Sequence, residues 1–262
     1  MHSDCVVCSI GDLVVHRISV AQEARKLGRN PTLDQETAIL GRRNRLQTQI
    51  DEFHAESRRY LGQEDLLTNL SSEEDERDWN LIDDEDEIHA PLEGHQIIDE
   101  QVVVPEKQCI ALPSSVRQQV LSPSLIALRE KELTLRIGQA NDALADLRVS
   151  IANRAIMFRT TIRTQRNYRG ATRAWRQMEG VSDTTKRAGQ VYTLARKAMH
   201  VLGASRDLLS RYKTLTQEDL KADTETLNFN EPGRRNNPVS WIWTMSEGGI
   251  EPEEIKEGMW FD

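Results

Sequence analysis

The stretch LTLRIGQANDALADLRVSI, residues 133–151, decides the fold class. Its apolar residues recur at intervals of four, three, four, three and four positions, which places them on one stripe of an α-helix. They are Leu133, Ile137, Ala140, Leu144, Leu147 and Ile151. Pro123, which follows Ser122, suits the first turn of such a helix. We therefore predict a helix over residues 123–157.

A second long helix is predicted over residues 172–203. Its apolar face is ended by Gly203, a typical stop, and comprises Trp175, Met178, Thr185, Ala188, Tyr192, Ala195, Met199 and Leu202. We expect the two long helices to be joined near Gly170 and to form an antiparallel hairpin. A shorter helix is expected at residues 205–213, and Thr216 is expected to cap a brief turn near residues 218–220.

The N-terminal part of the chain predicts two further helices. Residues 32–62 repeat apolar positions with an imperfect helical period, with Thr32 or Asp34 as the N-cap and Gly62 as the stop. An earlier helix is expected over residues 10–27. No alternating run predicts a sizeable β-sheet. We therefore predict an all-α fold, an elongated helical hairpin or three-helix bundle with coiled-coil character.

Acidic residues are concentrated between the N-terminal helices and the hairpin. Residues 64–100 hold 15 acidic residues and one base, Arg77. Such a segment buries too little apolar surface to offset its chain entropy, so we predict an acidic disordered linker. From Asn228 the composition indicates an irregular tail, where we favour internal docking of Trp241-Ile242-Trp243 over a role as a partner anchor. The predicted domains are residues 1–62, 63–122, 123–227 and 228–262.

Composition excludes several classes of protein. The chain has 262 residues, a net charge of −8 and three cysteines. Its apolar runs are far shorter than the about 18 residues of a membrane-spanning helix, and no secretory leader pattern is present. Three cysteines are too few for a disulfide framework. We therefore expect an intracellular protein with no membrane partner.

Motifs that carry catalysis are missing from the sequence. It has no Walker loop, dinucleotide glycine pattern, serine elbow or zinc-protease helix. Cys5 and Cys8 have the spacing of half a zinc site, but a structural site needs about four ligands, and Cys109, His16 and His2 have no spacing that completes it. We interpret the cysteines as ordinary thiols and predict no enzyme activity, metal, cofactor or small-molecule substrate.

Basic residues are concentrated in the hairpin, where residues 148–213 hold 15 basic and 3 acidic residues. Six arginines share one face if the backbone stays helical across Gly170: Arg159, Arg163, Arg166, Arg169, Arg173 and Arg176. Such a row suits weak, sequence-independent binding of DNA, with Tyr168 and Trp175 stacking on single strands. A solvated face, pairing with acids on neighbouring helices, and pairing with the acidic linker remain open, and together we favour these three.

Several motifs resemble a known family. LREKEL (128–133), LR (135–136), QANDAL (139–144) and LR (147–148) are similar to a segment downstream of the catalytic domain of fungal Kyakuja-Dileera-Zisupton (KDZ) transposases. Further landmarks follow in the family's order: Arg42-Arg43, Leu46, Ile50, Phe53, Tyr60, Leu61, the acidic stretch, Leu112-Pro113-Ser114-Ser115, Thr172-Arg173-Ala174-Trp175, Val191-Tyr192, Ala195-Arg196-Lys197-Ala198, Leu215, Glu218-Asp219-Leu220 and Trp241-Ile242-Trp243. The resemblance spans about residues 20–243.

The resemblance implies a non-catalytic role. The family's RNase H-like domain uses three acidic residues to hold metal ions for strand cleavage, and the matched segment lies after it, so no catalytic residue carries over. We expect a helical assembly or interaction region, with the nucleus as the implied compartment. Two alternatives stay open: a nucleic-acid-binding module gated by the acidic linker, and a coiled-coil protein that self-associates through Leu133, Ile137, Leu144, Leu147 and Ile151.

Overall fold

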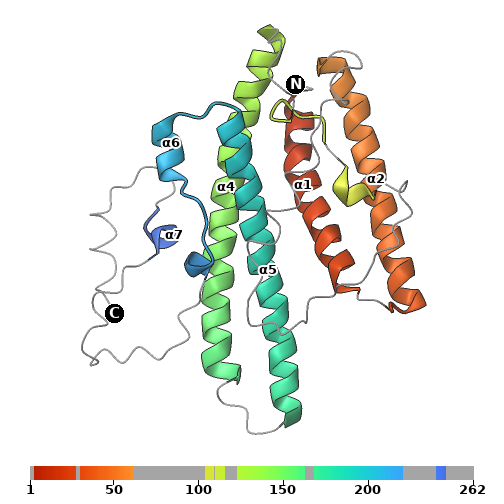
Figure 1. Cartoon of the computed structure of the whole chain (residues 1–262), viewed down its shortest axis with the longest axis vertical. Coiled ribbons are helices and arrows are strands. Elements are labelled where there is room, and N and C mark those ends of the chain that lie inside the picture. Colours follow the sequence, from red (N-terminus) through yellow and green to blue (C-terminus); the bar gives the residue numbers. More distant parts are fainter. Residues whose placement is uncertain are drawn as a thin grey trace. The chain divides into compact units, whose positions relative to one another are not determined.

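The computed structural model describes residues 3–27, 30–61, 104–108, 110–115, 123–162, 168–220 and 240–245. All regular elements in these ranges are helical (Figure 1). They are α1 (Ser3–Lys26), α2 (Leu33–Leu61), the 3-10 turn η1 (Pro105–Lys107), α4 (Pro123–Met157), the π-helical turn η2 (Phe158–Ile162), α5 (Tyr168–Val201), α6 (Arg206–Arg211), the 3-10 turn η3 (Glu218–Leu220) and α7 (Trp241–Thr244). The predicted all-α fold is confirmed for this part of the chain, and its coiled-coil character stays a prediction.

The chain forms two compact units, and α4 and α5 each contribute to both. Unit 1 comprises Met1–Gln139 and Leu194–Ala204, and unit 2 comprises Ala140–Thr193 and Ser205–Asp262. These boundaries differ from the predicted domains, because the two long helices pass through both compact units. Each unit is described by itself below.

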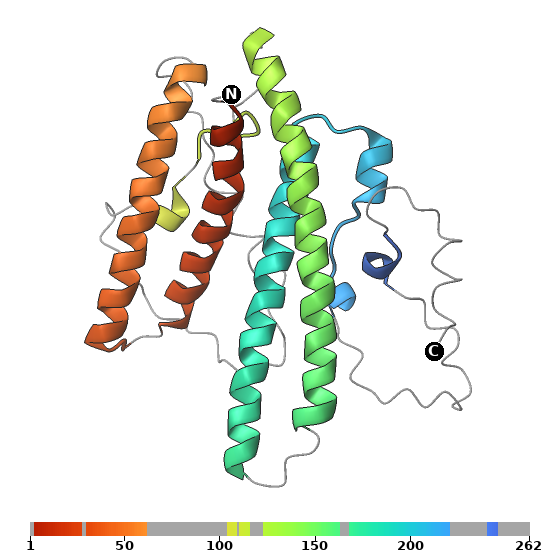
Figure 2. The ribbon, with the colours of Figure 1, turned by 180° about the vertical axis from the view of Figure 1, so that it is seen from behind.

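In unit 1, α1 and α2 lie side by side (Figure 2). Their buried apolar residues are Leu13, Val14, Ile18, Val20, Ile39, Leu46, Ile50 and Phe53. Thr32 caps α2 as predicted: the Gln35 amide donates to Thr32 Oγ1 over 3.4 Å, and the Thr32 amide donates to Gln35 Oε1 over 2.9 Å. Packing of α2 as a third helix on the hairpin stays a prediction, and Gly62 lies outside the described residues.

The first helix is longer than its sequence pattern indicated. We predicted a start near residue 10, but α1 begins at Ser3. The prediction was wrong because it relied on apolar spacing, whereas residues 3–9 contain no proline or glycine that would stop a helix. The motif Cys5-Val6-Val7-Cys8 therefore lies within α1.

Part of the predicted linker is structured. Val104 is extended, η1 follows it, and Ile110, Ala111 and Leu112 are buried. The prediction of disorder through residue 122 was therefore wrong for residues 104–108 and 110–115. The acidic residues 64–100 dominated that prediction and obscured the short apolar run at 110–112. Residues 62–103 and 116–122 lie outside the described part of the chain.

Unit 2 is built on an antiparallel hairpin. Residues 140–157 of α4 and 168–193 of α5 lie side by side and run in opposite directions in both views. α4 has the predicted bounds. The junction near Gly170 was predicted wrongly, because Gly170 lies in the first turn of α5, and a helix tolerates one glycine at about 1 kcal/mol. Residues 163–167, between the two helices, lie outside the described ranges.

In unit 1, α5 ends at the predicted glycine. Gly203 has φ +83°, a left-handed conformation that most side chains disfavour. The Ala204 amide donates to the Met199 carbonyl over 3.0 Å, and the Gly203 amide donates to the His200 carbonyl over 3.1 Å. This is the hydrogen-bond pattern of a Schellman motif, so Gly203 satisfies carbonyls that the end of the helix leaves open.

Candidate functional site

The predicted arginine row does not lie on one helix. Arg159 lies in η2, directly after α4, whereas Arg173 and Arg176 lie on α5, and the chain reverses direction between the two elements. The continuous helix that the prediction required over residues 159–176 was therefore wrong. Arg163 and Arg166 lie outside the described residues, and the same holds for the side chain of Arg169.

The hairpin nevertheless gathers positive charge at one end. The end of α4 and the start of α5 meet at the same end of the hairpin. Residues 147–178, which cover both, contain eight basic residues and no acidic residue. Arg173 and Arg176 are exposed, and Trp175 between them is 55% exposed. We call Arg173, Trp175 and Arg176 the hairpin-end cluster. Exposed cations beside an exposed indole are suited to phosphate contacts and base stacking.

The predicted interaction seam lies largely in the interior. Leu144, Leu147 and Ile151 are at most 3% exposed, and Leu133 and Ile137 are half-buried. A second copy of the chain reaches the three buried residues only if unit 2 opens, so their assignment to an intermolecular seam was wrong. An apolar stripe at helical spacing has the same sequence pattern whether its partner is in the same chain or in another.

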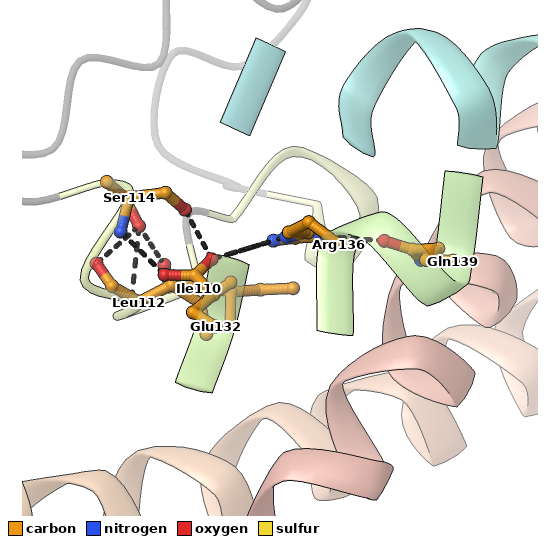
Figure 3. A network of polar contacts seen from close by, with 7 residues as sticks. Ile110, Leu112, Ser114, Glu132, Arg136 and Gln139 are labelled. Atoms are coloured by element: carbon orange, nitrogen blue, oxygen red, sulfur yellow. Dashed lines mark hydrogen bonds and ion pairs between the residues drawn. The ribbon is translucent and has the colours of Figure 1, made fainter. Parts of the chain in front are cut away.

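In unit 1, a buried ion pair fastens α4 to the turn at residues 110–115 (Figure 3). Arg136 Nη2 lies 3.2 Å from Glu132 Oε1. The other contacts of Glu132 come from Ser114, whose amide donates to Oε2 over 2.9 Å and whose hydroxyl donates to Oε1 over 2.6 Å. Arg136 Nη1 also donates to Gln139 Oε1 over 2.8 Å. Both carboxylate oxygens of Glu132 are therefore engaged in holding the turn.

Sequence reasoning assigned no role to this ion pair, although the signal was present. Glu132 and Arg136 are four positions apart, and oppositely charged residues at that spacing are neighbours on a helix. Both also lie next to the apolar stripe of α4, since Leu133 and Ile137 follow them directly. An ion pair at the margin of an apolar stripe is a candidate for burial, and here Glu132 is 3% exposed and Arg136 is 5% exposed.

A second set of polar contacts holds η1 to α1 and α2 in unit 1. Arg43 Nε donates to both oxygens of the buried Glu106 carboxylate, over 3.0 and 3.2 Å. The side-chain amides of Gln47 and Gln108 exchange hydrogen bonds of 3.2 and 2.9 Å. Arg17 Nη1 donates to the Gln108 carbonyl over 3.1 Å. Residues far apart in sequence thus fix both ends of η1.

In unit 2, Trp241-Ile242-Trp243 docks internally, as predicted. Ile242 is fully buried, and the Tyr192 ring lies 5.8 Å from a Trp241 ring at a tilt of 45°. Arg148 Nε donates to the Ile242 carbonyl over 2.7 Å, and Arg148 Nη2 donates to the Met245 carbonyl over 2.5 Å. Arg148 therefore caps the C-terminal end of α7.

The opposite end of α7 is held by Asp219. Ser240 Oγ donates to Asp219 Oδ1 over 2.7 Å, while Thr216 donates its amide and its hydroxyl to Asp219 Oδ2 over 3.0 and 2.6 Å. Burial alone would raise the pKa of Asp219, but the hydrogen bonds from Thr216 and Ser240 outweigh it and lower the pKa below 3.8. The predicted capping of this turn by Thr216 is confirmed. We call Arg148, Tyr192 and Asp219 the α7 cradle.

The described residues form no cluster of three or more His, Cys, Asp or Glu that would bind a metal ion. Cys5 and Cys8 lie in α1, and Cys109 lies outside the described ranges. Among the helices that the structure describes, none is both long enough and apolar enough to cross a membrane.

Comparison of the chain with protein-family models, with curated proteins and with solved structures finds no match. The resemblance to KDZ transposases therefore stays a prediction.

Proposed function

We propose that this chain is a non-catalytic helical assembly region, of the kind that follows the catalytic domain in KDZ transposase-like proteins. The observation that supports this role is the use of buried ionic side chains as fasteners. Glu132 pairs with Arg136, and Glu106 pairs with Arg43, in both cases to hold residues 104–115 on the helices. These carboxylates serve the stability of the fold, and both are committed to partners within unit 1.

The test of this proposal is a cleavage and strand-joining assay on supercoiled plasmid with Mg²⁺ or Mn²⁺. We expect the full chain to leave the plasmid intact over a range of protein concentrations. A metal-dependent nuclease of known activity is the positive control for the assay conditions. Cleavage that follows the chain through successive purification steps and stops on addition of a chelator would overturn the non-catalytic role.

A second candidate function is sequence-independent binding of nucleic acid at the hairpin end. It is favoured by the exposure of Arg173, Trp175 and Arg176 within a region that lacks acidic residues. The arginines would neutralise phosphates, and the indole would stack on an unpaired base. A DNA partner agrees with the nuclear compartment implied by the resemblance. The acidic residues 64–100 enter this proposal as a competitor for the same cations.

The nucleic-acid candidate is tested by fluorescence anisotropy with a labelled oligonucleotide at several salt concentrations. We expect Arg173→Ala/Arg176→Ala to weaken binding and to reduce the salt slope by about 1.8, from about 0.9 per phosphate contact on duplex. The matched control is Arg45→Ala/Arg58→Ala, which removes the same charge from the exposed surface of α2. Equal losses in the two double variants would refute a local site.

The contribution of the acidic residues is tested separately by deleting residues 64–100. We expect tighter binding of the same oligonucleotide, because the deletion removes a net charge of −14 that competes with phosphate. Unchanged affinity would exclude gating by this segment and leave the hairpin-end cluster untouched. A Trp175→Ala variant then separates stacking from charge, since it should weaken binding to single strands more than binding to duplex.

A further inference from the structure

α7 owes its conformation to the α7 cradle. It has four residues, whereas isolated helices shorter than about 12–15 residues are marginal in water. The N-cap residue Ser240 makes no side-chain cap bond to α7 itself, and its hydroxyl donates to Asp219 instead. The contacts with the cradle therefore select the helical form of residues 240–245.

The cradle holds this segment as proteins hold short helical peptides. One apolar anchor, Ile242, is fully buried, and the cradle binds both ends of the turn. Asp219 accepts the hydroxyl hydrogen of Ser240, and the Arg148 guanidinium donates to two main-chain carbonyls at the other end. Tyr192 adds a tilted aromatic contact with Trp241.

The docked segment lies far along the chain from its binding partners. The carbonyls that Arg148 binds are 94 and 97 residues away, and Ser240 follows Leu220 after 19 intervening residues. A chain of that length can span about 60–70 Å when extended. It is therefore long enough to carry residues 240–245 to the same cradle in a neighbouring molecule.

We propose that the α7 cradle is an exchangeable docking site, and that its second occupant is the Ser240–Met245 segment of another copy of this chain. Exchange conserves every contact described above, so the two arrangements differ mainly in effective concentration. The chain's own segment wins at micromolar protein, because a short tether gives it an effective concentration of about millimolar. The segment of a second copy docks when the chain's own segment is unable to. This proposal does not depend on nucleic-acid binding.

The test mixes two full-length variants with complementary defects. Ile242→Asp disables the segment and leaves the cradle intact, because a carboxylate cannot enter the apolar site. Arg148→Glu disables the cradle and leaves the segment intact, because a carboxylate repels the carbonyl end of α7. Each variant alone should be monomeric in sedimentation velocity. A mixture of the two should form a 1:1 complex.

The matched control replaces Arg148→Glu by Arg206→Glu, which reverses the charge of an exposed arginine in the same unit. Its own segment still fills its own cradle, so we expect its complex with Ile242→Asp to be at least about 10-fold weaker. Equal complexes with the two partners would overturn the proposal. Self-association of Ile242→Asp would overturn it as well, because that variant has no competent segment.

A peptide covering residues 237–248 gives a second measurement. It should bind to the Ile242→Asp chain more tightly than to the unmodified chain, whose cradle is filled, while the same peptide with Asp at position 242 should not bind. Circular dichroism establishes that the variant keeps its helices, and Ile242→Ala replaces it if they are lost. Failure of the peptide to bind to a folded variant, together with no complex in the mixture, refutes the exchange.

Discussion

The substitution Glu132→Ala leaves the Arg136 guanidinium buried without its counter-charge and removes both acceptors of Ser114. Breaking one partner of a buried ion pair costs about 3–5 kcal/mol. Each orphaned donor of Ser114 adds about 1–3 kcal/mol if it stays dry, but the turn can move toward water, so these costs overlap. Gln139 Oε1 still accepts from Arg136 and offsets a small part of the loss. We therefore expect a loss of about 3–5 kcal/mol from the free energy of unfolding of unit 1.

The measurement combines urea unfolding, followed by circular dichroism at 222 nm, with hydrogen exchange and mass spectrometry of residues 110–115. The Ser114 amide should exchange faster in Glu132→Ala, because its acceptor is gone. The matched control is Glu130→Ala, which removes the same charge from an exposed position on α4 and should change stability by at most about 0.5 kcal/mol.

The double variant Glu132→Leu/Arg136→Met separates pairing from packing. It leaves no buried charge, so it should cost less than Glu132→Ala alone. The reasoning is refuted if Glu132→Ala costs less than about 1 kcal/mol, or if the double variant costs as much as the two single losses added together. Unchanged exchange at residues 110–115 would refute the contact between Glu132 and the turn.

Three further changes test other parts of the structure. Because the folded-state pKa of Asp219 lies below 3.8, its stabilising contribution is complete above pH 3.8 and is lost as the pH falls through the lower folded value; tryptophan fluorescence should show release of α7 in that range, and Asp219→Asn should remove the step. Leu144→Asp places a carboxylate in the interior of unit 2, so it should abolish helical signal rather than dissociate an oligomer; a folded variant of lower mass would contradict this. Gly203→Ala should cost about 1–2 kcal/mol in thermal unfolding, from backbone conformation alone, because a Cβ atom there meets nothing within 4 Å; a neutral result would contradict the left-handed conformation.

The helices themselves were largely predictable from the sequence. Pro123 and the regular apolar spacing of residues 133–151 determined α4, because proline suits a first turn and the spacing repeats the helical period. Gly203 determined the end of α5, since its positive φ is a position where glycine has an advantage. Thr32 was predictable as a cap because Gln35 stands three residues after it.

The point at which the hairpin reverses was not predictable. Gly170 was the strongest local turn signal, yet it lies inside α5, because tertiary packing readily offsets the small helical cost of one glycine. The expected face of six arginines depended on that position. The arginines of the hairpin end were thus identified from their residue type, while their distribution over two antiparallel elements required the structure.

The contacts that close unit 1 were also beyond the sequence. Glu106 and Arg43 are 63 residues apart, and a single sequence carries no information on which distant acid an arginine meets. The same limit applies to Arg148, whose partners are main-chain carbonyls and therefore have no signature in residue type. The stripe of Leu144, Leu147 and Ile151 was recognised as apolar, but burial within one chain and burial between two chains require the same pattern.

The attachment of η1 to α2 makes the intervening chain a closed loop. Glu106 and Gln108 bind Arg43 and Gln47, so the 42 residues from 62 to 103 begin and end on the same unit. The entropy of closing a loop grows only with the logarithm of its length, and doubling the loop costs about 0.6 kcal/mol. A single deletion between Glu106 and Ser114 would instead shift one of the two fastenings off its partner. Natural length variants of this gene should therefore accumulate within residues 62–103, where insertions and deletions leave the helical units nearly unaffected, and be rare within residues 104–115.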